Sequence, residues 1–123
     1  MPRLTKLDHA SISVADVDGA ERFYCDVLGL EKLPRPNFEF PGVWLDGGGT
    51  PLHLTTGGVQ RSPESPLRAN ESHIAFTTDD PDGFIAHLAE HGVETWELEN
   101  SPAAERQIFF FDPWFNMIEL AVY

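Results

Sequence analysis

Hydrophobic and polar residues alternate in several short segments of this chain, and the order strand, helix, strands occurs twice. Residues 7–15 (LDHASISVA) place Ala10, Ile12 and Val14 on one face and polar residues on the other. This alternation is typical of a half-buried strand. Residues 73–78 (HIAFTT) alternate in the same way. The pattern therefore predicts a strand near the start of each half of the chain.

A helix follows each of these strands. Asp18, with Glu21 one helical turn later, predicts a capping box, and Gly29 predicts the end of the first helix. The Asp-Pro pair at 80–81 predicts the start of the second helix, which ends at Gly92. Further strands are predicted at 30–34, 42–46, 51–56, 93–98, 106–111 and 116–122.

The two halves can be aligned with each other. The alignment places His9 on His73 and residues 14–19 on residues 78–83. After a small insertion it places VWLD (43–46) on FFFD (109–112) and His53 on Glu119. Polar positions coincide as well as apolar ones, which favours an internal duplication over a chance likeness of two similar patterns. We expect a single domain, 1–123, with module 1 at 4–57, a linker at 58–70 and module 2 at 71–123.

Composition narrows the range of partners. The chain has 123 residues, 41% of them hydrophobic, and a formal net charge of −12. Such an acidic surface repels phosphate backbones and anionic lipid, so we expect neither nucleic-acid nor membrane partners. The start of the chain lacks the apolar stretch of a signal peptide, and the single cysteine, Cys25, cannot form an intrachain disulfide. We therefore expect a cytoplasmic protein that acts on a small molecule.

Four side chains point to metal chemistry. His9, His53 and His73 lie in strand patterns on the face opposite their apolar neighbours, and Glu119 does the same. Three imidazoles and a carboxylate on one face suit a divalent first-row metal, although a lone strand histidine is often only a hydrogen-bonded interior residue. We predict one ion of iron, nickel, cobalt, zinc or manganese, held by His9, His53, His73 and Glu119.

The remaining histidines have a simpler interpretation. His87 and His91 lie one turn apart on the predicted second helix. We expect them on a solvated helix face, with a second metal pair as the alternative.

Two segments resemble a known family. Residues 7–33 (LDHASISVADVDGAERFYCDVLGLEKL) are similar to the opening of the glyoxalase/bleomycin-resistance/extradiol-dioxygenase superfamily, also called vicinal oxygen chelate proteins. Residues 112–120 (DPWFNMIEL) are similar to its closing signature. The resemblance implies an α+β fold of two βαβββ modules, with mixed sheets that form a half-closed barrel and helices on the outside. It implies first-strand ligands at His9 and His73 and last-strand ligands at His53 and Glu119.

The chain departs from the family pattern at two positions. His53 stands where glyoxalase-like members usually have Glu or Gln, which argues against glyoxalase I activity. Phe115 replaces the glycine of the closing turn, so we expect a different backbone there and an aromatic ring directed towards the pocket.

The resemblance implies a metal-dependent lyase or isomerase that binds its substrate through two adjacent oxygens, with Glu119 and His53 as catalytic residues. An iron(II) extradiol-type dioxygenase is the alternative, with His9, His73 and Glu119 as ligands and His53 as an acid or base. A further alternative is a non-catalytic, antibiotic-resistance type of protein that binds a cationic or aromatic compound. An enzyme that opens phosphonate antibiotics ranks last, because Lys and Arg together number only 8. We also expect a homodimer, since an uncovered edge strand invites pairing.

Overall fold

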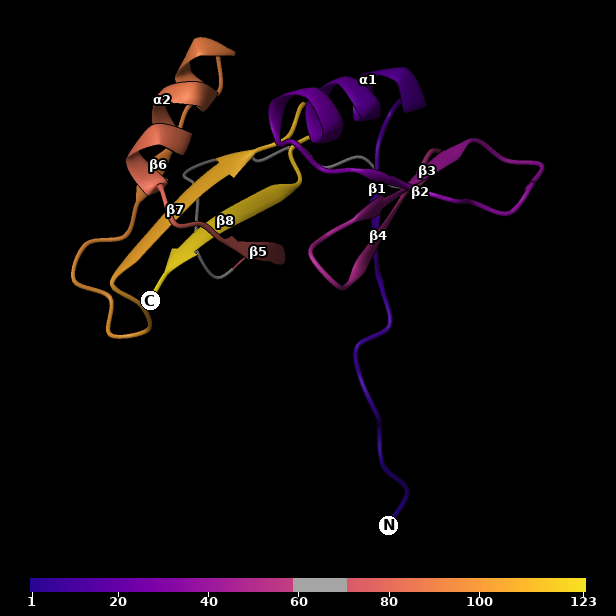
Figure 1. Ribbon diagram of the computed structural model, residues 1–123, viewed down its shortest axis with the longest axis horizontal. Coiled ribbons are helices and arrows are strands. Elements are labelled where there is room, and N and C mark those ends of the chain that lie inside the picture. The colour runs from indigo at the N-terminus through magenta and orange to yellow at the C-terminus, as the bar shows by residue number, and fades with distance from the viewer. Residues whose placement is uncertain (59–70) are drawn as a thin grey trace. The chain divides into compact units, whose positions relative to one another are not determined.

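The computed structural model describes residues 1–58 and 71–123. All of the predicted linker (58–70) except Gly58 lies outside the described residues. The chain divides into two compact units, Met1–Val59 and Gln60–Tyr123 (Figure 1). Within the described part of the chain, no helix is long and apolar enough to cross a membrane.

The first unit contains one mixed sheet and one helical segment. Its elements are β1 (Ala10–Ser13), α1 (Val17–Glu21), the π-helical turn η1 (Arg22–Val27), β2 (Lys32–Leu33), β3 (Gly42–Asp46) and β4 (Pro51–Thr55). The strand order in the sheet is β1-β4-β3-β2, with β1 parallel to β4 and the other pairs antiparallel.

The second unit repeats this order of elements. It contains β5 (His73–Thr77), α2 (Pro81–Glu90), β6 (Trp96–Glu97), β7 (Arg106–Phe111) and β8 (Met117–Val122), with strand order β5-β8-β7-β6. Again the first strand is parallel to the last, and the other pairs are antiparallel. The predicted α+β class and the two βαβββ modules are confirmed.

The N-cap residue was predicted correctly for α2 but not for α1. Asp80 caps α2 as predicted, and its Oδ1 accepts a hydrogen bond of 3.0 Å from the Gly83 amide. The prediction of Asp18 as the first N-cap is wrong, because the cap is Asp16, whose Oδ1 accepts from the Gly19 amide at 2.5 Å. The position that donates to Asp80 is glycine for a steric reason, since a Cβ at Gly83 would lie 2.1 Å from the Asp80 carboxylate.

Strand pairing supports the internal repeat. In the first unit Ser11 lies opposite His53, and in the second Ala75 lies opposite Glu119. These two pairs correspond to each other in the alignment of the halves. The first and last strands of the two units therefore have the relation that the sequence predicts.

Strands β3 and β7 match each other in the structure with an offset of one position from the sequence alignment. The sequence alignment places Trp44 on Phe110, whereas in the structure Trp44 pairs with His53 and Phe109 pairs with Glu119. Phe109 is thus the structural counterpart of Trp44. The cause is the turn between β7 and β8, which is longer by one position than the turn between β3 and β4. Each last-strand candidate ligand therefore has an aromatic residue as its cross-strand neighbour.

Each sheet has one face whose central positions are apolar and buried, and charged residues occur only at its margins (Lys32 in the first sheet, Glu97 and Arg106 in the second). The side chains that are fully buried include Val14, Tyr24, Leu45 and Leu54 in the first unit and Leu88, Ile108, Phe110 and Ile118 in the second. Since successive strand residues point to opposite faces, the predicted ligands lie on the other face of each sheet. Burial of the apolar face therefore decides which residues are available for chemistry.

The turn between β7 and β8 is organised by the buried carboxylate of Asp112. Its Oδ1 accepts hydrogen bonds from the amides of Trp114 (2.9 Å) and Asn116 (2.8 Å), and its Oδ2 accepts one from the Asn116 side chain (2.8 Å). Phe115 has a φ of 63°, the left-handed conformation that glycine adopts at little cost. Its ring is exposed and meets Phe111 edge-on, with centroids 5.6 Å apart.

Replacing Asp112 with Ala is expected to lower the free energy of unfolding by about 2–4 kcal/mol, because the hydrogen bonds to a buried carboxylate are lost. Asp46→Ala is the matched control, since Asp46 accepts from Gly48 and Gly49 in the corresponding turn but is more exposed. Urea unfolding of both variants should show the larger loss for Asp112→Ala. Equal losses would contradict this account of the turn.

Candidate metal centre

In the first unit, His9 lies directly before β1 with one ring nitrogen already engaged. Its Nδ1 lies 2.8 Å from Oδ2 of Asp8, and this hydrogen bond lowers the pKa of the Asp8 carboxyl. A carboxylate can only accept, so Nδ1 carries a proton and the neutral form of the ring has its lone pair on Nε2. Histidines that bind metals commonly have this kind of carboxylate partner. Asp8 is a residue that the sequence pattern did not single out.

His53 is held between two flat rings. Its centroid lies 4.0 Å from that of His9 and 3.9 Å from that of Trp44, and the interplanar angles are 17° and 4°. Stacking uses the faces of the imidazole and leaves its nitrogen edge uncommitted. Burial and the neighbouring His9 lower the pKa of His53, which favours the neutral ring. The two stacked rings therefore hold His53 in position through the faces of its imidazole.

In the second unit, His73 has the same arrangement as His9. Its Nδ1 lies 2.6 Å from the main-chain oxygen of Glu71, an obligatory acceptor, so Nδ1 donates. The other nitrogen, Nε2, lies 3.2 Å from Oε1 of Glu119. With Nδ1 donating to Glu71, a neutral His73 ring would direct its Nε2 lone pair at a carboxylate oxygen. Such a contact is favourable only if a cation, either a proton or a metal ion, lies between the two atoms.

Glu119 is buried within β8, and only 7% of its side chain is exposed. Gln107 on β7 supports it, since its Nε2 lies 3.4 and 3.5 Å from the two carboxylate oxygens. The amide oxygen of Gln107 is buried without a hydrogen-bond partner among the described residues. Sequence reasoning missed Gln107, because the apolar run Ile108–Phe111 does not indicate which face of the strand it shares, whereas the strand register places it on the face of Glu119.

The structure brings the four predicted ligands together in pairs. His9 lies beside His53 in the first unit, and His73 lies beside Glu119 in the second. Over residues 1–58 and 71–123, no set of three or more His, Cys, Asp or Glu side chains is close enough to hold one ion. His87 and His91 meet edge-on, with centroids 4.7 Å apart, and are not part of any such set.

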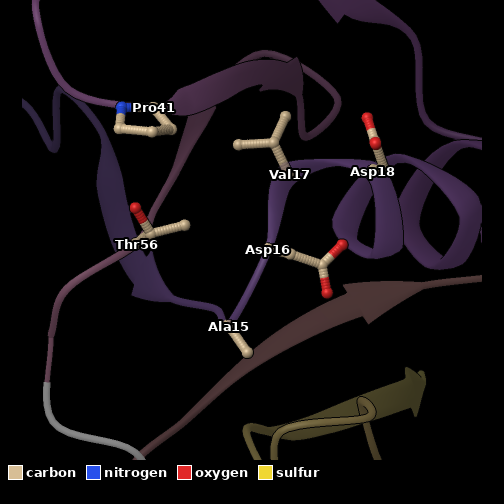
Figure 2. A pocket seen from close by; sticks show the side chains of 6 residues that line it. All are labelled: Ala15, Asp16, Val17, Asp18, Pro41 and Thr56. Atoms are coloured by element: carbon tan, nitrogen blue, oxygen red, sulfur yellow. The ribbon is translucent and has the colours of Figure 1, made fainter.

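A shallow hollow of about 310 Å³ lies elsewhere in the first unit. Figure 2 shows Asp16 and Asp18 where the chain enters α1, together with Pro41 and Thr56 from the segments beside β3 and β4. Asp16 is occupied as the helix cap. None of the predicted ligands lines this hollow.

Comparison with known proteins identifies the family. The sequence profile of the glyoxalase/bleomycin resistance protein/dioxygenase superfamily matches residues 6–120. The chain belongs to this superfamily.

Two proteins resemble this glyoxalase superfamily protein in sequence, and a solved structure resembles it in fold. The chain is 26% identical over 114 residues to YaeR of Escherichia coli, covering 89% of this chain and 88% of YaeR. It is 28% identical over 121 residues to the glutathione transferase FosA of Serratia marcescens, covering 97% and 82%. Its fold matches an E126Q mutant of the fosfomycin resistance protein FosX from Listeria monocytogenes, with a TM-score of 0.81, 19% identity and coverage of 98% and 93%. That FosX structure contains manganese(II) and 1S,2S-dihydroxypropylphosphonic acid.

Proposed function

We propose that the chain is a metal-dependent enzyme of the lyase or isomerase type, which binds its substrate through two adjacent oxygens. His9, His53, His73 and Glu119 are the proposed ligands of one divalent ion per chain. Glu119 and His53 are also the proposed catalytic residues. The observation that carries the proposal is the contact between His73 Nε2 and Glu119 Oε1.

The spacing of these two atoms suits a shared ion. Two ligand atoms about 2.1 Å from one ion and at right angles to each other are about 3.0 Å apart. The observed separation is 3.2 Å, and the hydrogen bond to Glu71 already fixes the tautomer that ligation requires. Gln107 orients the carboxylate, which is the role of the outer hydrogen bonds around metal ligands. This donor pair therefore fits a divalent first-row metal.

The first unit supplies a similar but more neutral pair. Asp8 holds His9 in the tautomer with a free Nε2, and Trp44 holds His53 by stacking. With Glu119 as the only anionic ligand, a divalent ion keeps a net positive charge and attracts an anionic substrate. The ion supplies Lewis acidity to two neighbouring substrate oxygens. The lowered pKa keeps the His53 ring neutral, and when that ring does not bind the metal its basic nitrogen is available to accept a proton from the substrate.

Opening of phosphonate antibiotics is a second candidate. It is favoured by the 28% identity to FosA and by the fold shared with FosX. The small number of cations still argues against it, because a phosphonate site uses several. Assays of the metal-loaded protein should therefore include fosfomycin with glutathione, methylglyoxal with glutathione, and catechols.

Metal titration is the first test. The purified protein is expected to bind one ion of manganese(II), iron(II), cobalt(II), nickel(II) or zinc(II) per chain, measured by calorimetry and elemental analysis. Glu119→Gln should weaken the affinity at least about 10-fold, because a charged ligand is lost. The control His91→Ala removes an exposed histidine and should leave the affinity unchanged. Binding of none of these metals below millimolar concentration would refute the proposal and favour a binding protein without catalysis.

Substitution of His53 tests the alternative reaction. If His53 is a ligand, His53→Ala should weaken metal affinity about 10- to 100-fold, as losses at supporting positions do. If affinity is unchanged and turnover alone falls, the ligands are His9, His73 and Glu119, the set of an iron(II) extradiol-type dioxygenase. Oxygen uptake with catechols on the iron-loaded protein then identifies that reaction. Robust methylglyoxal–glutathione turnover would show that a histidine at this position does not prevent glyoxalase I activity.

We also propose a homodimer. Edge strands with unpaired backbone groups favour pairing with a second chain. Leu4 and Leu7, which precede β1, are highly exposed in the single chain. Light scattering at tens of micromolar should give twice the chain mass of 13.7 kDa. A monomer mass under those conditions would rule the dimer out.

A further inference from the structure

One cation near the candidate metal centre, Arg35, has no counter-charge among the residues that the structure describes. Arg35 lies in the loop between β2 and β3, and its Nη2 donates a hydrogen bond of 3.0 Å to the main-chain oxygen of Phe40. Within 1–58 and 71–123, its buried Nε has no hydrogen-bond partner and no carboxylate forms an ion pair with it. By contrast, Arg106 in the second unit pairs with both Asp82 and Glu97. Most of the chain's 20 acidic side chains lie in the described segments, and one of them could have served as a partner if Arg35 acted in stability alone.

Gly42 provides the space for this guanidinium. A Cβ added at Gly42 would lie 2.8 Å from Nη2 and 3.0 Å from Nε of Arg35. Gly42 and Trp44 are alternate residues of β3, so they share a face of the sheet. Because Trp44 stacks on His53 from that face, the guanidinium lies on the face that carries the candidate ligands. Arg35 is also one of the charges that lower the pKa of His53.

A row of aromatic rings connects the candidate metal ligand His53 with Arg35. We call Phe38, Phe40 and Trp44 the aromatic wall. The Phe38 ring lies 6.2 Å from Trp44 and 5.0 Å from Phe40, and the Arg35 guanidinium lies 4.9 and 5.1 Å from the two phenylalanine rings. Phe38 and Phe40 are 42% and 50% exposed, which is unusual for adjacent large apolar residues. The first unit thus presents flat apolar surface beside a positive charge that has no ion-pair partner among the described residues.

We propose that Arg35 and the aromatic wall bind the substrate, and that the substrate is a small carboxylate with a flat aromatic or unsaturated group. The carboxylate contacts the remaining Nη hydrogens of Arg35, and the flat group packs on the wall next to His53. The inference rests on the proposed function in placing the reacting oxygens near His53. It adds the chemical class of the substrate and names Arg35 as the residue that selects it.

The simpler role for Arg35 is to close the loop onto Phe40. That role uses one N–H group of the guanidinium and the faces of the Phe38 and Phe40 rings, and it gives no reason for the lack of a carboxylate partner among the described residues. It predicts that Arg35 affects stability and not ligand charge preference. A binding role predicts a strong preference for anions, because a fork of N–H donors matches a carboxylate.

Benzoate is the probe, with benzyl alcohol and benzylamine as its neutral and cationic counterparts. Binding is measured by calorimetry and by the NMR signal of Arg35 Nε–H, first on the metal-free protein and then on the metal-loaded protein. We expect benzoate to bind at least about 10-fold more tightly than either counterpart and to shift that signal. Arg35→Met should weaken benzoate binding about 10- to 100-fold, and Arg35→Lys should weaken it less. The control Arg22→Met removes an exposed cation on η1 and should have little effect.

Each outcome supports or overturns the proposal. Equal binding of the three probes, no benzoate binding at about 50 mM, or unchanged affinity in folded Arg35→Met would overturn it. Arg35→Lys covers the case in which Arg35→Met does not fold. Benzoate binding that depends on Arg35 in a protein that binds no metal would uphold this site and refute the proposed function. Metal binding without benzoate binding would support the proposed function and refute the substrate site at Arg35.

Discussion

Successive side chains of a strand point to opposite faces of its sheet, and one of these faces must be buried. The rest of the structure depends on this constraint. In each unit the apolar residues of the strands are buried, and the alternate residues must lie on the opposite face. The first strand is parallel to the last in each unit, so polar residues of both strands become neighbours there. A slip of a single position in either strand would move His53 or Glu119 into the apolar layer. The candidate ligands are thus placed by the same burial that stabilises the sheets.

The order of elements and the faces of the strands could be predicted from the sequence because they depend on local periodicity. The relation between the first and last strands of the two units also follows from the sequence, since His9 matches His73 and His53 matches Glu119. The offset of β3 from β7 could not be predicted, because apolar runs such as Ile108–Phe111 fit more than one register. The N-cap assignment to Asp18 failed for a related reason, since Asp16 and Asp18 both have side chains able to cap and only the backbone path decides between them.

The supporting contacts of the site were less accessible to sequence reasoning. Asp8 contacts His9 at 2.8 Å, and Gln107 contacts the Glu119 carboxylate at 3.4 and 3.5 Å. Sequence periodicity predicts the face on which a side chain lies, but it does not predict such contacts. Arg35 lies in a loop rich in proline, where no period applies. Its position depends on Gly42, and an isolated glycine at a strand end has many explanations. These residues require the fold before their role can be recognised.

The two units differ chemically although their sheets have the same strand order. Each first-strand histidine has its Nδ1 fixed by an acceptor that precedes it in the chain, which leaves Nε2 as the candidate ligand atom in both units, in contact with Glu119 in the case of His73. Each last-strand position faces an aromatic neighbour, but one holds a stacked imidazole and the other a buried carboxylate. The aromatic neighbours differ as well, since Trp44 continues into exposed rings beside Arg35, whereas Phe109 is buried against Trp96. Under the proposed function, the second unit neutralises part of the charge of the metal, and the first unit selects an anionic substrate.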